Sequence, residues 1–255
     1  MNMRWLRSLS SVGLAVLITE SAVMAGDEVK AIHPQPVACV KKDLPAAKTD
    51  SNKNLVYIPP KRGSPEGRVA GGTRGPQEFP RLIALAPDHR GLTIQERPAL
   101  YWVLPNTTKY PITLTVINAD TSTVVVEKSL PPPTRPGVQT IRLDQYDIRL
   151  VMGVPYRWLV TVGSESEGEY VFAGGVMERV APSASLSVKL QQACPSELPA
   201  IYLAEGVWYD ALQSLVELID ETPHDVALRQ QYAALLEQVG LTEAARYGDI
   251  PRIGK

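Results

Sequence analysis

Residues 201–240, IYLAEGVWYDALQSLVELIDETPHDVALRQQYAALLEQVG, decide the fold of the C-terminal part of this chain. Apolar side chains recur there at three- and four-residue spacing, from Trp208 to Ile219 and again from Leu228 to Val239. Such spacing places each set on one face of an amphipathic helix. The stretch therefore predicts two helices joined as a hairpin.

The boundary between the two helices is marked by helix-capping residues. Thr222 is the predicted N-cap of the second helix, with Pro223 at its first position and Asp225 as the acid of a capping box. Gly240 is the predicted stop signal.

This hairpin is similar to the second half of a tetratricopeptide repeat (TPR). A single unit of that kind cannot bury its own apolar face, because such arrays need about three repeats. The face must therefore pack within the chain or dock on another subunit or partner, and the sequence leaves both alternatives open. The similarity follows the order Gly206, Trp208, Ala211, Leu215, Leu218 and Pro223, and the candidate interaction residues are Trp208, Tyr209, Leu212, Leu228 and Tyr232.

The first 25 residues have the features of a cleaved signal peptide. Arg4 and Arg7 precede an apolar run, residues 9–18, which is too short to span a bilayer. Val23-Met24-Ala25 fits a cleavage site before Gly26. We therefore expect an exported protein, periplasmic or extracellular, with no transmembrane segment in the mature chain.

Residues 26–60 lack any hydrophobic period and are predicted to be a disordered linker. They include one apolar run, residues 55–58, that could be a single edge strand docking elsewhere. Residues 61–75 are rich in glycine and arginine but lack the Gly-Lys-Ser/Thr ending of a nucleotide-binding loop. They are either a turn-rich leading segment or an anion site formed by Arg62, Arg68 and Arg74.

From residue 81 to residue 180 the hydrophobic period changes to two. Six or seven short runs with turn signals between them predict an antiparallel, Ig-like β-sandwich. The expected fold is thus α+β, with a β-sandwich domain over residues 61–182 and a helical, TPR-like tail over residues 183–247.

Five blocks in this order resemble the DUF928 family, a group of uncharacterised exported bacterial proteins that is common in cyanobacteria. The resemblance covers about residues 60–245 and implies a β part with a helical tail, but no established activity. The blocks are RGSPEGRVAGGTRG (62–75), RPALYW (97–102), GVPYRW (153–158), GVMERV (175–180) and GVWYDAL (206–212).

The two cysteines, Cys39 and Cys194, are a possible disulfide in an exported chain. No metal site is predicted, because no Cys-x-x-Cys is present and the three histidines are scattered. With 26 basic and 27 acidic residues, the chain is not expected to bind nucleic acid through bulk charge.

Residues that could catalyse a reaction are sparse. Glu165, Glu167 and Glu169 would share one face of a hairpin, as an acid cluster or as a solvated hairpin end. The strand aromatics are either core residues or a face that stacks on carbohydrate. They are Tyr101, Trp102, Tyr156 and Trp158.

These patterns predict a non-enzymatic protein-interaction or assembly module of the bacterial envelope, whose partner is another envelope protein. No catalytic residue and no cofactor is predicted. A glycan- or anion-binding β module is the alternative, and a cryptic hydrolase is the second alternative. The sequence does not indicate the oligomeric state.

Overall fold

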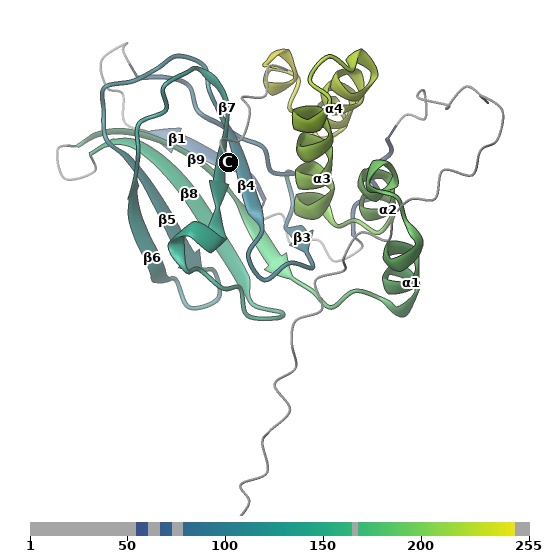
Figure 1. Cartoon of the computed structure of the whole chain (residues 1–255). Coiled ribbons are helices and arrows are strands. Elements are labelled where there is room, and N and C mark those ends of the chain that lie inside the picture. The colour runs from purple at the N-terminus through teal and green to yellow at the C-terminus, as the bar shows by residue number, and fades with distance from the viewer. Residues whose placement is uncertain (1–54, 61–66, 73–78, 165–167, 248–255) are drawn as a thin grey trace, which may run out of the picture. The chain divides into compact units, whose positions relative to one another are not determined.

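The computed structural model describes residues 55–60, 67–72, 79–164 and 168–247, and all of them belong to one compact unit, Gln35–Lys255. In this part of the chain strands come first and helices follow, as predicted (Figure 1). The strands are β1 (Val69–Gly72), β2 (Ile83–Ala84), β3 (Gly91–Thr93), β4 (Ala99–Leu104), β5 (Ile112–Asn118), β6 (Thr123–Leu130), β7 (Gly137–Arg142), β8 (Pro155–Ser164) and β9 (Glu169–Arg179). The α-helices are α1 (Ala184–Gln192), α2 (Leu198–Ala204), α3 (Trp208–Glu221) and α4 (Val226–Gln238), and short 3-10 helices lie at Leu143–Tyr146, Pro195–Glu197 and Ala244–Arg246.

The strands form two sheets that share a core. The larger sheet has the order β1-β9-β8-β5-β6, with β3 also paired to β9, and the smaller sheet has the order β2-β4-β7. All pairings are antiparallel except that of β3 with β9. The predicted antiparallel β-sandwich with a helical tail is therefore confirmed.

The alternation of buried and half-buried residues in β5 shows why these strands form. Ile112, Leu114 and Val116 are buried, while the threonines between them are half-buried. Side chains on a strand point alternately to its two faces, so the buried set faces the sandwich core. Pro155 is the first residue of β8, where it removes no interior ladder donor.

Strand β4 departs from this alternation because all six of its residues are buried. One face of β4 lies toward the larger sheet, and α3 contacts the strand from the helical part of the chain (Figure 1). Sandwich and helices therefore contribute to one continuous core.

The glycine–arginine segment contains a strand that the sequence did not predict. Val69–Gly72 pairs with β9, and bare glycine backbone makes the close approach possible. A Cβ at Gly71 would lie 2.8 Å from the ring of Phe172. The prediction of turns throughout residues 61–75 is wrong for these four residues, because missing side chains allow strand pairing as well as turns.

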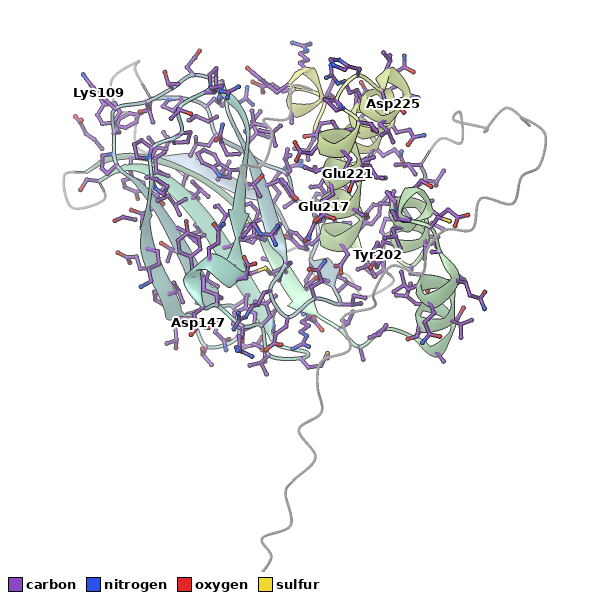
Figure 2. The ribbon with its side chains drawn as sticks, viewed as in Figure 1. Lys109, Asp147, Tyr202, Glu217, Glu221 and Asp225 are labelled. Atoms are coloured by element: carbon purple, nitrogen blue, oxygen red, sulfur yellow. The ribbon has the colours of Figure 1, made fainter. Side chains whose placement is uncertain are left out.

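The two predicted helices of the hairpin are present as α3 and α4, but the predicted cap is wrong. Thr222 ends α3, where its hydroxyl donates to the carbonyl of Leu218 at 2.7 Å. Asp225 is the N-cap of α4, because its carboxylate accepts from the amides of Ala227 and Leu228. Figure 2 shows Asp225 at the start of α4, beyond Glu221 at the end of α3.

Among the described residues, no helix combines the length and the apolar character that crossing a membrane requires.

Candidate peptide-binding site

Residues 55–60, which we call the docked segment, lie against the helical part of the chain. Leu55 and Tyr57 are buried, whereas Val56 and Ile58 are exposed by 60% and 53%. The predicted docking of this apolar run is therefore observed, although it forms no strand. The predicted linker ends too late, since these residues belong to the folded body.

The side-chain amide of Gln238, the last residue of α4, binds the backbone of the docked segment twice. Its Nε2 donates to the carbonyl of Leu55 at 2.7 Å, and its Oε1 accepts from the amide of Tyr57 at 3.1 Å. On the α2 side, the amide of Ile58 donates to the carbonyl of Leu203 at 3.1 Å. These three bonds contact only backbone atoms of the segment, so they fix its register without depending on its side chains.

Tyr57 lies between two aromatic side chains. Its ring meets the ring of Trp208 edge-on at 5.1 Å between centroids and stacks on His89 at 5.7 Å with an interplanar angle of 12°. Both distances are in the range that favours aromatic pairs. Tyr57 is thus the side chain that anchors the docked segment.

The hydroxyl of Tyr57 continues into a polar chain. It lies 2.8 Å from Nε2 of His89, whose Nδ1 lies 3.0 Å from the carboxylate of Asp88. Burial and then the nearby Tyr209 and Asp88 hold the pKa of Tyr57 well above its usual value. The hydrogen bond from His89 lowers the pKa of Asp88. The order matches a nucleophile, a base and an acid, but a raised phenol pKa opposes phenolate formation. This series of hydrogen bonds therefore does not favour a phenolate nucleophile at Tyr57.

Gly206 gives the docked segment room to lie close to the start of α3. Its φ is +74°, and a Cβ at this position would lie 2.9 Å from the carbonyl oxygen of Ile58 and 3.2 Å from Pro60. A larger residue would strain this turn and push the segment away.

The five candidate interaction residues face inward, so the structure supports packing within the chain over docking for the hairpin's apolar face. Leu228 is half-buried, and the other four are at most 1% exposed. The indole of Trp208 donates to the carbonyl of Leu85 at 3.0 Å. The Tyr209 hydroxyl accepts from the indole of Trp158 at 3.0 Å and donates to the carbonyl of Val176 at 3.2 Å. The interaction residues proposed from sequence are thus corrected: Trp208, Tyr209, Leu212 and Tyr232 belong to the core that the helices share with the sandwich.

Asp210 is a buried carboxylate on the same helix. It is 1% exposed, and its Oδ2 accepts from the backbone amide of Ile94 at 3.2 Å. Burial raises its pKa to about 6, against the lowering effect of hydrogen bonds from Thr93 and Ile94. The residue ties the segment after β3 to α3.

Of the three candidate anion-binding arginines, only Arg68 lies among the described residues. Its Nη1 donates to the carbonyls of Ala86 at 3.1 Å and Val239 at 3.2 Å. The second contact satisfies a carbonyl at the end of α4, a common role for arginine. Arg68 therefore stabilises the fold, and anion capture is not supported for it. Arg62 and Arg74 lie outside the described residues.

The strand aromatics do not form a carbohydrate-stacking face. Tyr101, Trp102, Tyr156 and Trp158 are between 0% and 5% exposed, so all four are core residues. Tyr101 lies beside Tyr232 of α4, and all four rings belong to the single core that the sheets and the helices share.

The acidic residues are dispersed where the structure describes them. Glu169 is exposed, and Glu165 and Glu167 lie outside the described residues. Glu178 pairs with Arg90 at 2.8 Å. Within the described ranges, no group of three or more His, Cys, Asp or Glu residues is placed to hold a metal ion.

Cys194 is disulfide-bonded. Its predicted partner, Cys39, lies outside the described residues, so the pairing stays a prediction. Cys194 precedes the 3-10 helix Pro195–Glu197, and its amide donates to the Glu197 carboxylate at 2.8 Å.

Strand β6 is a second surface that could bind a partner. It ends the larger sheet and exposes Val124 and Val125 by 52% and 49% (Figure 1). Two features protect this edge. The register shifts at Val125, and Lys128 lies opposite the buried Leu114, on the core-facing side. A bulge and an inward charge both discourage pairing with a further strand, so β6 is the weaker candidate.

Sequence reasoning missed the residues that hold the docked segment. Gln238 is an ordinary helical glutamine, and His89 belongs to a short turn before β3. The signals available were the isolated apolar run at residues 55–58 and the histidine among polar turn residues. Neither identifies the other as its neighbour.

The comparisons with known proteins give a family and a distant structural likeness. The model of the Domain of Unknown Function DUF928 matches residues 69–247. No curated protein matches the chain. The chain is also similar to a solved DUF3244-family protein with an immunoglobulin-like β-sandwich fold from Bacteroides vulgatus ATCC 8482. That similarity has 12% identity and a TM-score of 0.27, over 44% of this chain and 98% of the other. Because the DUF928 model covers both the sandwich and the helices, this chain belongs to the DUF928 family.

Proposed function

We propose that this protein is an exported, non-enzymatic interaction or assembly module of the bacterial envelope that binds an extended peptide segment of a partner protein. The observation that carries the proposal is the set of hydrogen bonds that α2, α4 and His89 make with residues 55–60. The partner is another envelope protein that presents an aliphatic residue and, two positions later, a tyrosine.

The chemistry of the site is that of peptide recognition. The Gln238 side chain and the Leu203 carbonyl bind the backbone of the segment, and the side chains of Leu55 and Tyr57, at alternate positions, are buried. Extended peptides are commonly recognised by this combination of main-chain bonds and alternate side-chain pockets. In this proposal the α3–α4 hairpin is a TPR-like unit that binds the peptide with Gln238, at the end of α4. The Ig-like sandwich supports the hairpin.

The extent of the family match adds a second argument. The match begins at residue 69, so it includes Gln238, Leu203 and His89 but not the docked segment. The site thus lies within the family domain and its present occupant outside it. An occupant from a partner protein would need only the same spacing of side chains.

The site can be tested by weakening its internal occupant in the full mature chain. With Leu55→Ala and Tyr57→Ala together, a synthetic peptide of residues 53–61 should bind with one-to-one stoichiometry in calorimetry. The wild-type chain should bind the peptide about tenfold more weakly or worse, because its own segment competes at a high effective concentration. A peptide with Leu and Tyr moved by one position is the matched control, and it should not bind.

A folding control accompanies this test, because Leu55 and Tyr57 belong to the core cluster. Circular dichroism should show the wild-type spectrum, and adding the peptide should raise the melting temperature of the double variant. A folded double variant that binds the shifted peptide as well as the natural one would refute the proposed function.

A further inference from the structure

The hydroxyl of Tyr57 contacts His89, which in turn contacts Asp88. Tyr57 is 8% exposed and the His89 side chain is 16% exposed, so their 2.8 Å contact is largely shielded from water. Asp88, at 79% side-chain exposure, contacts the far side of the imidazole. The three groups are thus connected in series, from the buried phenol of Tyr57 through His89 to the exposed Asp88.

The direction of the hydrogen bonds follows from the chemistry of Asp88. An ionised carboxylate can only accept, so Nδ1 of His89 must carry a hydrogen. In the neutral imidazole Nε2 is then an acceptor, and the Tyr57 hydroxyl is its donor. Because Nε2 of the half-buried His89 accepts, a ligand at this site must supply a hydrogen-bond donor to it.

We infer that this site is specific for peptides with an unmodified tyrosine at the position of Tyr57, and that the His89–Asp88 pair determines this specificity. The inference rests on the proposed function, since it names the ligand of the same site. Phenylalanine would fill the same space but would leave Nε2 of His89 without a partner. Sites built to bond a hydroxyl discriminate strongly against ligands that lack it.

The surrounding rings restrict the choice further. Trp208 meets the tyrosine ring edge-on, and the His89 ring lies near-parallel to it beyond the hydroxyl, so a smaller side chain would leave a void beside them. Asp88 acts only through His89, as a positioning residue that fixes the imidazole tautomer.

The test compares two peptides of residues 53–61, with Tyr or Phe at position 57, on the full chain carrying Leu55→Ala and Tyr57→Ala. The Tyr peptide should bind about tenfold more tightly or better. His89→Phe keeps an aromatic ring at this position but lacks nitrogen, and in that background the ratio should fall to about one. Asp88→Asn should lower the ratio by a smaller factor, which a purely structural role would not do.

A second measurement uses the wild-type chain, so that the inference stays testable if the double variant does not fold. Tyr57→Phe should lower the folding equilibrium constant, the ratio of folded to unfolded protein, by about tenfold when His89 is present. The same substitution should leave that constant unchanged in the His89→Phe variant. This thermodynamic cycle isolates the contact between the two side chains.

The outcomes separate the two proposals. Absence of binding by both peptides to a folded chain would refute the proposed function. Equal binding of the Tyr and Phe peptides would leave the peptide site standing and overturn the inference of tyrosine specificity. A preference for Tyr that persists in His89→Phe would overturn the assignment to His89.

Discussion

Two surfaces of the helical part differ in how they bind their neighbours. The apolar face of α3 is covered by the sandwich through fully buried side chains such as Trp208 and Leu212. At the end of α4, the exposed Gln238 binds the backbone of the docked segment through its side-chain amide, beside the buried side chains of Leu55 and Tyr57. The first surface is part of the core. The second adds polar bonds to the backbone of a separate segment, and the apolar stripe of α3 gives no sign of it.

The sharpest way to break this comparison is Trp208→Ala. Removing this buried indole should lower the free energy of unfolding by about 3–5 kcal/mol. Urea unfolding followed by circular dichroism measures the loss. Val226→Ala, at a side chain on α4 that is 66% exposed, is the control and should change stability by less than about 0.5 kcal/mol. A loss at Trp208 as small as that of the control would show that α3 is not part of the core.

The predicted bond between Cys39 and Cys194 would tether the N-terminal side of the docked segment to the helical part. Cys194→Ser should then cost about 2–4 kcal/mol under oxidising conditions, mostly through greater freedom of the unfolded chain. Cys39→Ser should cost the same, and the double variant no more. Effects that add in the double variant would contradict the pairing.

Asp210→Asn tests the core surface by pH. The folded pKa of about 6 lies above the ordinary value of 3.8, so burial favours the protonated acid. Its contribution to stability is therefore full below about pH 3.8 and is lost as the pH rises through 6. Between pH 4 and pH 7 the wild type should lose about 2–3 kcal/mol relative to Asp210→Asn, which does not ionise. A stability difference that stays flat over this range would show that Asp210 is not desolvated.

The smallest effect is expected at the docked segment. Gln238→Ala removes two side-chain bonds to the segment's backbone at an exposed position and should cost about 1 kcal/mol. Hydrogen exchange at the Tyr57 amide should accelerate, while exchange in β8 stays unchanged. Gln230→Ala, at an exposed glutamine on the same helix, is the matched control. Equal acceleration in both variants would mean that Gln238 does not hold the segment.

The parts of this molecule that sequence predicted are those with local signals. Period-two runs such as Ile112 to Val116 marked strands, and the stripe from Trp208 to Ile219 marked α3. The strand at Val69–Gly72 escaped prediction because glycines carry no face preference. The register of β1 on β9 is set by a partner about a hundred residues away, which periodicity does not encode.

The candidate site was hidden for the same reason. An apolar stripe shows that a surface must be covered but not by what, so the sequence left Trp208 open to a core and to a docking role. Gln238 gains its role only by lying next to Leu55 and Tyr57 in the folded chain. Polar residues that bind backbone leave no spacing in the sequence.

The span of the Gln238–Tyr57 contact has a consequence for the order of folding. The two residues are 181 positions apart, so the contact closes only after nearly the whole chain has been synthesised. Contacts at such separation form late, because they carry the largest loop-closure cost. We therefore expect the nascent chain to pass through a stage in which residues 55–60 have emerged with nothing to bind. During that stage an apolar stretch is open to chaperones, and its capture by them would set the yield of the folded protein.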